Sequence, residues 1–300
     1  MGKLNVDFLR NIAKFEAAMK KRFLIKSAFY KKMFRGKGLE FDYHRRYTEG
    51  DDASLIDWKV SMRAHDLFIK RYLEERDLKI FFIVDVGDNM VLGSGEHLKN
   101  EIAAEITASI AHLAIISGDS VGFELYGENI KKRQMFSSGI KQFYILEKNL
   151  KDSKIYGGKS NLGKTLEILM PYLKNVSAVF IISDFINLDE KSSKILKQFS
   201  SRYETIGIMV KDPIDVELPN LKREVVIEDI STGRQMLINP GLIRHEYKRH
   251  ALKQKNEIEI LFKKSGADLL TIYTDKDFIL PLTEFLKMRI RNKRFVIPRR

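Results

Sequence analysis

The stretch Lys79-Ile80-Phe81-Phe82-Ile83-Val84-Asp85 decides the fold class of this chain. It is a short apolar run that ends in a carboxylate, and such continuous apolar strands are typical of parallel sheets covered on both faces. A glycine-containing loop follows, and then a helix is predicted over residues 97–117. Apolar residues at helical spacing mark its expected inward face: Ile102, Ile106, Ile110, Leu113 and Ile116.

Strands and helices continue to alternate toward the C-terminus. Further strands are predicted over residues 120–126, 131–136 (an antiparallel neighbour), 176–183, 204–210 and 267–273. Helices are predicted over residues 139–150, 162–173, 189–200, 242–264 and 280–291. Residues 217–238 interrupt this order and predict a β-hairpin that turns at Ser231-Thr232-Gly233. The pattern as a whole predicts a doubly wound α/β fold with a mostly parallel sheet.

The residues before this sheet form a different region. Residues 1–32 predict one or two amphipathic helices whose apolar face holds Phe8, Ile12, Phe15, Met19 and Phe23. A turn at 35–38, an extended stretch at 39–47 and a short helix at 57–64 are expected next. We therefore divide the chain into an N-terminal helical and signature region (1–78), an α/β domain with the hairpin insertion (79–292) and a basic tail (293–300).

Lys and Arg exceed Asp and Glu by 53 to 40, which gives a net charge of +13. Much of this excess lies near the two ends, and a charge of this sign favours acidic partners. Solvated basic faces are the simpler interpretation, because no nucleic-acid-binding motif accompanies the charge. Binding to nucleic acid or to an anionic surface through the basic ends remains an alternative.

The chain contains no cysteine, which excludes disulfides, thiolate metal sites and thiol nucleophiles. No secretory signal is recognised at its start, and no stretch reaches the roughly 18 apolar residues that a membrane span needs. These observations predict a cytoplasmic protein without a membrane span.

Two of the apolar strands end in aspartates, Asp85 and Asp184. If these strands are neighbours, their carboxylates meet at the carboxyl edge of the sheet, where ligands of open α/β sheets bind. The loop 157–163 could add the hydroxyl of Ser160. Such oxygens suit Mg²⁺. The competing interpretation is that each aspartate only caps the turn or helix after it.

A nucleotide-binding loop is a rival for the same region. Gly158 and Gly163-Lys164-Thr165 match the spacing of a Walker A motif. That loop must follow a buried apolar strand, whereas residues 149–156 are mostly polar and come from a predicted helix. Nucleotide binding is therefore not expected.

Several motifs together resemble a known family. They are Gly36-Lys37-Gly38, Arg46-Tyr47, Gly50-Asp51-Asp52, Ile56-Asp57-Trp58, Arg63 and Ile182-Ser183-Asp184-Phe185. With Asp85, and less specifically with Asp212-Pro213, Leu218-Pro219, Asp229 and Thr232-Gly233, they resemble the domain of unknown function 58 family over residues 30–292. The resemblance implies a von Willebrand A fold and an association with MoxR-type AAA+ ATPases. Such pairs are thought to act in the assembly, maturation or metal insertion of other proteins, which would be the clients.

The resemblance also implies a position for a metal-ion-dependent adhesion site. That site has the pattern Asp-x-Ser-x-Ser, followed later by Thr and Asp. This chain has Asp85-Val86-Gly87-Asp88-Asn89, so Gly87 loses one ligand and Asn89 replaces a hydroxyl with an amide oxygen. Ser160 would stand for the Thr and Asp184 for the last Asp. The expected site is degenerate, either with Mg²⁺ bound or as a metal-free remnant with the same binding rim.

The signature region itself offers further candidates for partner binding: Arg46, Asp51, Asp52 and Trp58, with Asp88 at the rim. Trp58, the only tryptophan, is expected to be a core anchor because its burial removes a large apolar area from water. The charged residues are equally compatible with a structural ion-pair network that includes Arg63.

The sequence thus favours a non-catalytic adaptor or scaffold over an enzyme. It would bind its partner through the degenerate adhesion site of Asp85, Ser160 and Asp184, with or without Mg²⁺. The alternative is a metal-dependent hydrolase in which Asp85, Asp88 and Asp184 hold the ion. No general base or arginine clamp is recognised near these residues, which argues against it.

Overall fold

The computed structural model describes residues 4–22, 39–49, 51–74, 78–186, 188–221, 223–228 and 233–291. Its centre is a six-stranded sheet in which every pair of neighbours is parallel except one antiparallel edge pair, β4 and β5. The order across the sheet is β10 (Asp268–Tyr273), β7 (Thr205–Lys211), β6 (Ala178–Ser183), β3 (Lys79–Asp85), β4 (Ser120–Tyr126) and β5 (Ile130–Ser137). The predicted α/β fold with a mostly parallel sheet is confirmed.

Strand β3 lies in the middle of this sheet, as its continuous apolar sequence predicts. It pairs in parallel with β6 on one side and with β4 on the other. The side chains of Ile80 to Val84 are buried, because helices cover both faces of the sheet. As β3 and β6 are neighbours, their carboxyl ends bring Asp85 and Asp184 to one edge.

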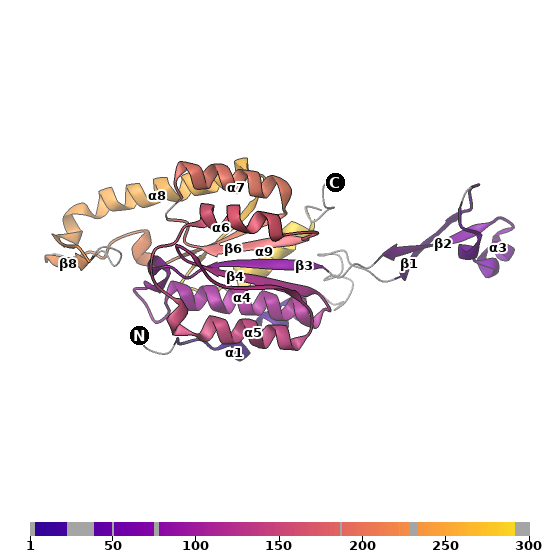
Figure 1. The fold of residues 1–300 in the computed structure, drawn as a ribbon, viewed down its shortest axis with the longest axis horizontal. Coiled ribbons are helices and arrows are strands. Elements are labelled where there is room, and N and C mark those ends of the chain that lie inside the picture. The colour runs from indigo at the N-terminus through magenta and orange to yellow at the C-terminus, as the bar shows by residue number, and fades with distance from the viewer. Residues whose placement is uncertain are drawn as a thin grey trace.

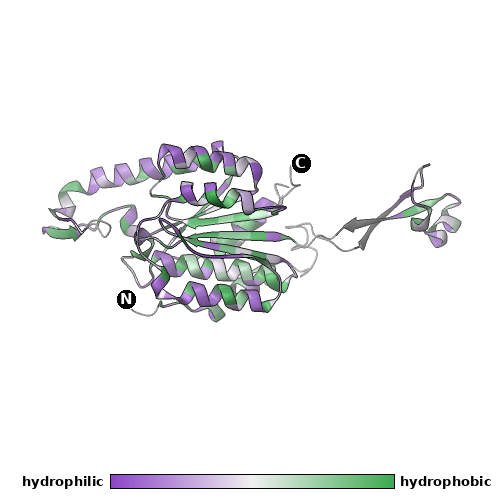
Figure 2. Cartoon of the chain, in the orientation of Figure 1, coloured by the Kyte–Doolittle hydropathy of each residue, from purple (hydrophilic) through white to green (hydrophobic). Residues whose placement is uncertain are grey.

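Two helical layers cover the sheet (Figure 1). One face carries α1 (Phe8–Arg22), α4 (Lys99–Ile116), α5 (Ile140–Lys151) and α9 (Ile279–Arg291). The other carries α6 (Leu162–Leu169), α7 (Glu190–Arg202) and α8 (Pro240–Lys264). The two apolar clusters that hold the layers lie on opposite faces of the sheet, and the colours of Figure 2 show polar residues on the outer sides of the helices.

Helix α4 is buried on most of its surface, because α1 and α5 cover the side that faces away from the sheet. Ile102, Ile106 and Ile110 are buried as expected. The expectation for Ile116 was wrong: it lies at the last position of the helix, beyond these covering helices, and it is half exposed.

Helix α1 packs into the core of the α/β domain. Phe8, Ile12, Phe15 and Met19 are buried, as the amphipathic pattern predicts. The backbone N–H of Asn5 donates to Oε1 of Glu101 at 2.6 Å, which ties the start of this segment to α4. The first helix of the region 1–78 is therefore a part of the core. Phe23 and the turn at 35–38 lie outside the described residues.

The signature region forms an arm that stands apart from the rest of the molecule (Figure 1). The arm consists of β1 (Leu39–Arg46), a 3₁₀ turn η1 (Ala53–Leu55), α3 (Trp58–Ala64) and β2 (Phe68–Glu74). Strands β1 and β2 are antiparallel, and Leu39 is opposite Glu74. The extended stretch and the short helix were predicted, whereas β2 was missed.

The predicted hairpin is present as β8 (Val225–Glu228) and β9 (Gln235–Ile238), which are antiparallel. Ser231 and Thr232 of its predicted turn lie outside the described residues. Val226, Ile227, Met236 and Leu237 are all exposed, so the hairpin presents apolar side chains that nothing in the described part of the chain covers.

One described basic residue near the C-terminal end is buried, although the basic ends were expected to be solvated. Arg289 belongs to the basic residues near the C-terminal end, for which solvated faces were the simpler interpretation, yet it is only 2% exposed. Its guanidinium forms ion pairs with Glu204 and Asp268, so it fastens α9 to the edge of the sheet. Residues 293–300 lie outside the described residues.

Among the described helices, none is both long enough and apolar enough to cross a membrane.

Candidate functional site

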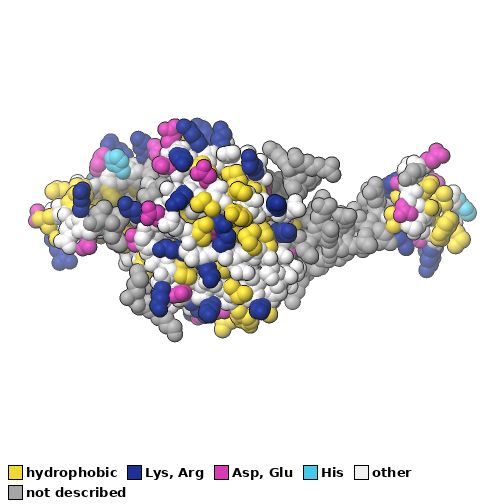
Figure 3. Space-filling view, viewed as in Figure 1, with side chains coloured by type: hydrophobic (Ala, Val, Ile, Leu, Met, Phe, Trp, Pro, Cys, Tyr) yellow, Lys and Arg dark blue, Asp and Glu magenta, His cyan; other side chains and the backbone are white. Residues whose placement is uncertain are grey.

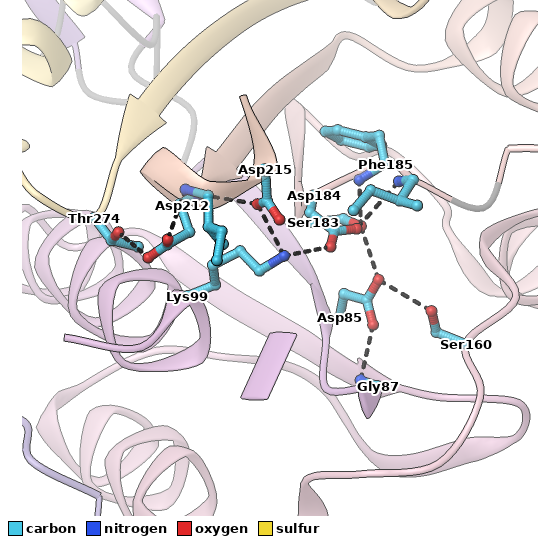
Figure 4. Close-up of polar contacts among 12 residues, drawn as sticks. Asp85, Gly87, Lys99, Ser160, Ser183, Asp184, Phe185, Asp212, Asp215 and Thr274 are labelled. Atoms are coloured by element: carbon cyan, nitrogen blue, oxygen red, sulfur yellow. Dashed lines mark hydrogen bonds and ion pairs between the residues drawn. The ribbon is translucent and has the colours of Figure 1, made fainter. Parts of the chain in front are cut away.

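The carboxylate of Asp85 is the centre of a hydrogen-bonded cluster at the carboxyl edge of the sheet (Figure 4). Its Oδ1 accepts from the backbone N–H of Gly87 at 2.9 Å. Its Oδ2 accepts from the hydroxyls of Ser183 at 2.7 Å, Tyr126 at 3.2 Å and Ser160 at 3.3 Å. Side chains from β3, β4, β6 and the loop before α6 thus converge on one buried carboxylate.

Burial is the main cause of an unusual pKa at this position. It disfavours the charged form of Asp85, and the neighbouring charge of Asp184 acts in the same direction. Hydrogen bonds from Gly87 and Ser183 oppose this, yet the pKa is raised to about 6. Burial also raises the pKa of Tyr126 well above its ordinary value, so its hydroxyl stays a donor to Asp85.

The second aspartate is held by a buried lysine. Nζ of Lys99, the first residue of α4, lies 2.9 Å from Oδ2 of Asp184 and 3.0 Å from Oδ2 of Asp215. The Lys99 side chain is fully buried. Burial lowers the pKa of Lys99, but the two carboxylates outweigh that effect and raise it. An ammonium is therefore the cation at this edge of the sheet.

The network continues beyond Asp215. The backbone N–H of Asp212 donates to Oδ2 of Asp215 at 2.9 Å. Asp212 itself accepts from the backbone N–H of Ser94 at 3.0 Å and from the hydroxyl of Thr274 at 2.7 Å. The loops after β3, β7 and β10 are thereby joined into one polar layer next to the cluster of Asp85.

Backbone geometry at the end of β6 is also unusual. Phe185 adopts a left-handed conformation with a φ of 55°. Its N–H donates to the hydroxyl of Ser183 at 3.0 Å, and its ring packs in the core against Phe262. A bulky residue in this conformation is strained, and such strain is commonly found at functional sites.

The structure brings together the rim residues that the sequence predicted. The hydroxyls of Ser160 and Ser183 both donate to the carboxylate of Asp85. Asp184 is the residue after Ser183. Asp88 turns toward the loop of Ser160, because its Oδ1 accepts from the N–H of Gly158 at 2.7 Å. Asn89 lies half-buried in the turn η2 (Asp88–Val91), and its amide makes no hydrogen bond within the described part of the chain.

These residues do not fit a divalent metal ion. Asp184 is already neutralised by Lys99, and both oxygens of Asp85 accept bonds from the protein. A Cβ added at Gly87 would lie 2.9 Å from the Cβ of Ser160, so the missing serine has no room. Within the described ranges, no group of three His, Cys, Asp or Glu residues could hold a metal. Of the two expected forms of the rim, the donor set favours the metal-free one over the form with Mg²⁺ bound.

The candidates in the arm lie elsewhere. The arm joins the amino end of β3, whereas the rim lies at its carboxyl end, and Figure 1 shows the arm and the hairpin β8–β9 at opposite ends of the molecule. The expected ion-pair network has other members: Arg45, not Arg46, pairs with Asp51, and Arg46 pairs with Asp66 at 2.9 Å. Asp52 caps η1 by accepting from the N–H of Ser54.

The prediction that Trp58 is a core anchor was wrong. Its side chain is 62% exposed. Asp57 caps α3 by accepting from the N–H groups of Lys59 and Val60, which fixes the helix with Trp58 as its first residue. The described residues of the arm form one hairpin, the turn η1 and one short helix, and they include no second layer under which an indole could be buried.

Several residues of the site were missed from the sequence, namely Lys99, Tyr126, Ser183 and Asp215. A signal existed for Lys99, because a lysine in the first turn of a mostly apolar helix lies at the positive end of the helix dipole. Such a residue needs a nearby carboxylate. Tyr126 is the last residue of β4 and lies opposite Asp85, the last residue of β3. No sequence pattern distinguishes it from a tyrosine of the core.

The fold and the rim define the class of this protein as a von Willebrand A-like α/β domain. The chain belongs to the family described as "Protein of unknown function DUF58", whose model matches residues 43–257. An uncharacterized protein of Mycobacterium tuberculosis is 26% identical over 260 residues, covering 85% of this chain and 81% of the relative. A protein of Mycobacterium avium, also uncharacterized, is 31% identical over 137 residues, 45% of this chain and 79% of that one.

Solved structures give distant likenesses. An aerotolerance-related membrane protein from Bacteroides fragilis has a TM-score of 0.47 at 13% identity and covers 72% of this chain and 99% of its own. A von Willebrand factor type A protein from Catenulispora acidiphila has a TM-score of 0.40 at 9% identity. The match covers 75% of this chain and 44% of that protein.

Proposed function

We propose that this chain is a non-catalytic, cytoplasmic protein-binding adaptor that works with a MoxR-type AAA+ ATPase in the assembly or maturation of other proteins. The observation that carries this proposal is the exposed apolar surface at the tip of the arm. The ATPase as partner is supported by the family resemblance, and the binding surface is supported by the side chains of the tip.

The tip surface consists of Trp58, Met62, Leu67 and Leu55. Trp58 is 62% exposed and Met62 is 72% exposed, and they lie one helical turn apart on α3. Figure 3 shows hydrophobic side chains gathered on the described part of the arm at its far end. Tryptophan and methionine are enriched in protein interfaces, and clustered exposed apolar side chains mark interaction sites.

The tip is also held in a defined shape, which lowers the entropy that binding costs. Asp57 caps α3 and its other oxygen lies 2.9 Å from Nε2 of His44 on β1. Hydrogen bonding to His44 is the largest cause that lowers the pKa of Asp57 to about 2, so it stays ionised as a cap. Ile69 on β2 is buried beneath the helix.

The geometry of the rim supports a non-catalytic role. A general base needs a free oxygen or nitrogen that can reach a substrate. Asp85 is buried and accepts four hydrogen bonds, and Asp184 is paired with Lys99. This arrangement suits a structural support better than a hydrolytic centre.

The test is a binding measurement between the purified chain and the MoxR-type ATPase of the same genome. We expect Trp58→Ala and Met62→Ala each to weaken binding, with Trp58→Ala about 30-fold weaker if it is a hot spot. Tyr144→Ala on α5, which removes a similarly exposed aromatic ring, is the matched control and should bind normally. Binding should not change when EDTA is added.

A variant of the hairpin β8–β9 tests the second exposed apolar surface in the same measurement. Val226→Ser with Leu237→Ser removes a directly opposed apolar pair of β8 and β9. Loss of binding in this variant, with normal binding by Trp58→Ala, would move the contact to the hairpin. An absence of binding by the wild-type chain, with and without nucleotide on the ATPase, would contradict the proposed partner.

A further inference from the structure

A cavity lies next to the rim, between helix α8 and the carboxyl ends of β6 and β7. Its volume is about 410 Å³. Lys211, the last residue of β7, and Asp215 form its inner wall, and Tyr247, His250 and Lys253 line it from α8. The volume is that of a small-molecule pocket, and the position is where α/β sheets bind ligands.

Lys211 is the unusual member of this wall. It is 4% exposed, and its ammonium forms no hydrogen bond or ion pair with any residue in the described ranges. Lys99, its buried neighbour, is bound by two carboxylates instead. Burial lowers the pKa of Lys211, and the more distant charges of Asp184 and Asp215 only partly oppose this. A buried cation without a partner is costly unless an anion joins it.

The carboxylates around the cavity are already engaged. Asp215 is bound by Lys99 and by the N–H of Asp212. Glu257, at the solvent side, lies 4.0 Å from the ammonium of Lys253. Neither carboxylate therefore pairs with Lys211, and no other carboxylate among the described residues forms an ion pair with it.

The wall on the side of α8 is fixed rather than loose. The hydroxyl of Tyr247 donates to the carbonyl of Ile214 at 2.9 Å, and the amide of Gln254 donates to the carbonyl of Ile186 at 3.3 Å. Both bonds tie α8 to loops at the ends of β6 and β7. The cavity is therefore formed before a ligand arrives.

We propose that this cavity binds a small anion, a molecule carrying a carboxylate or a phosphate, and that the anionic group pairs with Lys211. Lys253 lies at the solvent side and adds positive charge along the entry. This binding is separate from the contact made by the arm, so it holds or fails independently of the proposed adaptor function.

Calorimetric titration at constant ionic strength tests the proposal, with inorganic phosphate and succinate as the two probes. We expect saturable binding of at least one probe to the full chain, and the probe that binds assigns the anion as phosphate or carboxylate. Lys211→Met should weaken binding about 10- to 100-fold, the loss of one charge-assisted contact. Lys263→Met, which removes an exposed charge from the end of the same helix, should bind like wild type.

A second variant keeps the test decisive if Lys211→Met does not fold. Ala251→Phe fills the cavity from α8 and leaves Lys211 in place, so it should abolish binding while circular dichroism shows an intact fold. The proposal is overturned if neither probe binds the wild-type chain saturably, or if binding survives in Ala251→Phe or in a folded Lys211→Met.

Discussion

The ammonium of Lys99 lies 2.9 Å from the carboxylate of Asp184, and both side chains are buried. Asp184 holds the last carboxylate position of the expected metal site. The chain therefore supplies its own cation where related adhesion sites would recruit one. A lysine cannot be removed by a chelator and cannot coordinate a partner's carboxylate as an ion with an open shell does, which changes how this edge can act.

Removing that cation should destabilise the fold strongly. Lys99→Met leaves the buried Asp184 and the partly buried Asp215 without their common partner, so we expect a loss of about 3–5 kcal/mol in the free energy of unfolding. Urea denaturation followed by circular dichroism measures it. Lys191→Met, which removes an exposed and loosely paired lysine, should change stability by less than about 1 kcal/mol. Equal effects of the two variants would contradict the role of Lys99.

Magnesium should not stabilise the wild-type chain. A site occupied at about 100 times its Kd would add about 2.7 kcal/mol and raise the melting temperature by several degrees. We expect the same melting temperature in Mg²⁺ and in EDTA, because Lys99 already neutralises Asp184. A rise that depends on the Mg²⁺ concentration and disappears in Asp184→Asn would restore the metal site.

Restoring the serine of the adhesion motif should harm the protein. The added Cβ in Gly87→Ser would lie 2.9 Å from the Cβ of Ser160 and 3.1 Å from the carbonyl oxygen of Gly158. Gly87 has a φ of −69°, which any residue adopts, so the expected cost of about 1–3 kcal/mol comes from overpacking alone. Combining it with Ser160→Gly should recover part of this loss in thermal unfolding. An unchanged melting temperature for Gly87→Ser would show that the loop has room.

The raised pKa of Asp85 predicts how stability depends on pH. Its pKa is about 6 in the folded protein and has an ordinary value of 3.8 when unfolded, so the folded state binds this proton more tightly. The contribution of Asp85 to the free energy of unfolding is therefore greatest below pH 4 and falls as the pH rises to about 6. The two values correspond to about 3 kcal/mol, and Asp85→Asn should remove that decline.

Denaturation curves at intervals between pH 4 and pH 8 measure this dependence. Asp275→Asn, an exposed residue of the same charge, is the control and should keep the slope of the wild type. A slope that is the same in wild type and Asp85→Asn would mean that other groups cause it.

Substitution of Trp58 and of Ile69 should differ in their effect on the stability of the arm. Trp58 is exposed at the tip, so Trp58→Ala should change the free energy of unfolding by less than about 0.5 kcal/mol. Ile69 is 3% exposed beneath α3, so Ile69→Ala should cost the arm about 2–4 kcal/mol. Limited proteolysis of the arm compares the two. Faster cleavage of Trp58→Ala than of Ile69→Ala would contradict the assigned surfaces.

Much of the fold was predictable because buried parallel strands have a distinctive sequence. Strand β3 has the predicted bounds, and the helices α4 to α9 lie within a few residues of their predicted ranges. Strand β2 was missed because apolar and charged residues of Phe68–Glu74 come in pairs, without the one-by-one alternation that indicates a half-buried strand. Trp58 was misplaced for a different reason: its burial depends on whether a second layer covers the arm, which no local pattern specifies.

Of the residues at the rim, the sequence predicted the aspartates that end strands but not the residues that surround them. Asp85 and Asp184 end apolar strands, so parallel pairing alone brings them to one edge. Lys99, Tyr126 and Asp215 come from distant segments and join through tertiary packing. The identity of the cation, an ammonium in place of a metal ion, depends on where one long side chain points, and the spacing of residues along the chain does not encode that direction.

The antiparallel pairing of Leu39 with Glu74 has a consequence for how this family can vary. A hairpin leaves its parent domain and returns to it at adjacent points, so its length can change without displacing any strand of the central sheet. The tip can therefore change in length and sequence while the strand order and register of the central sheet stay the same.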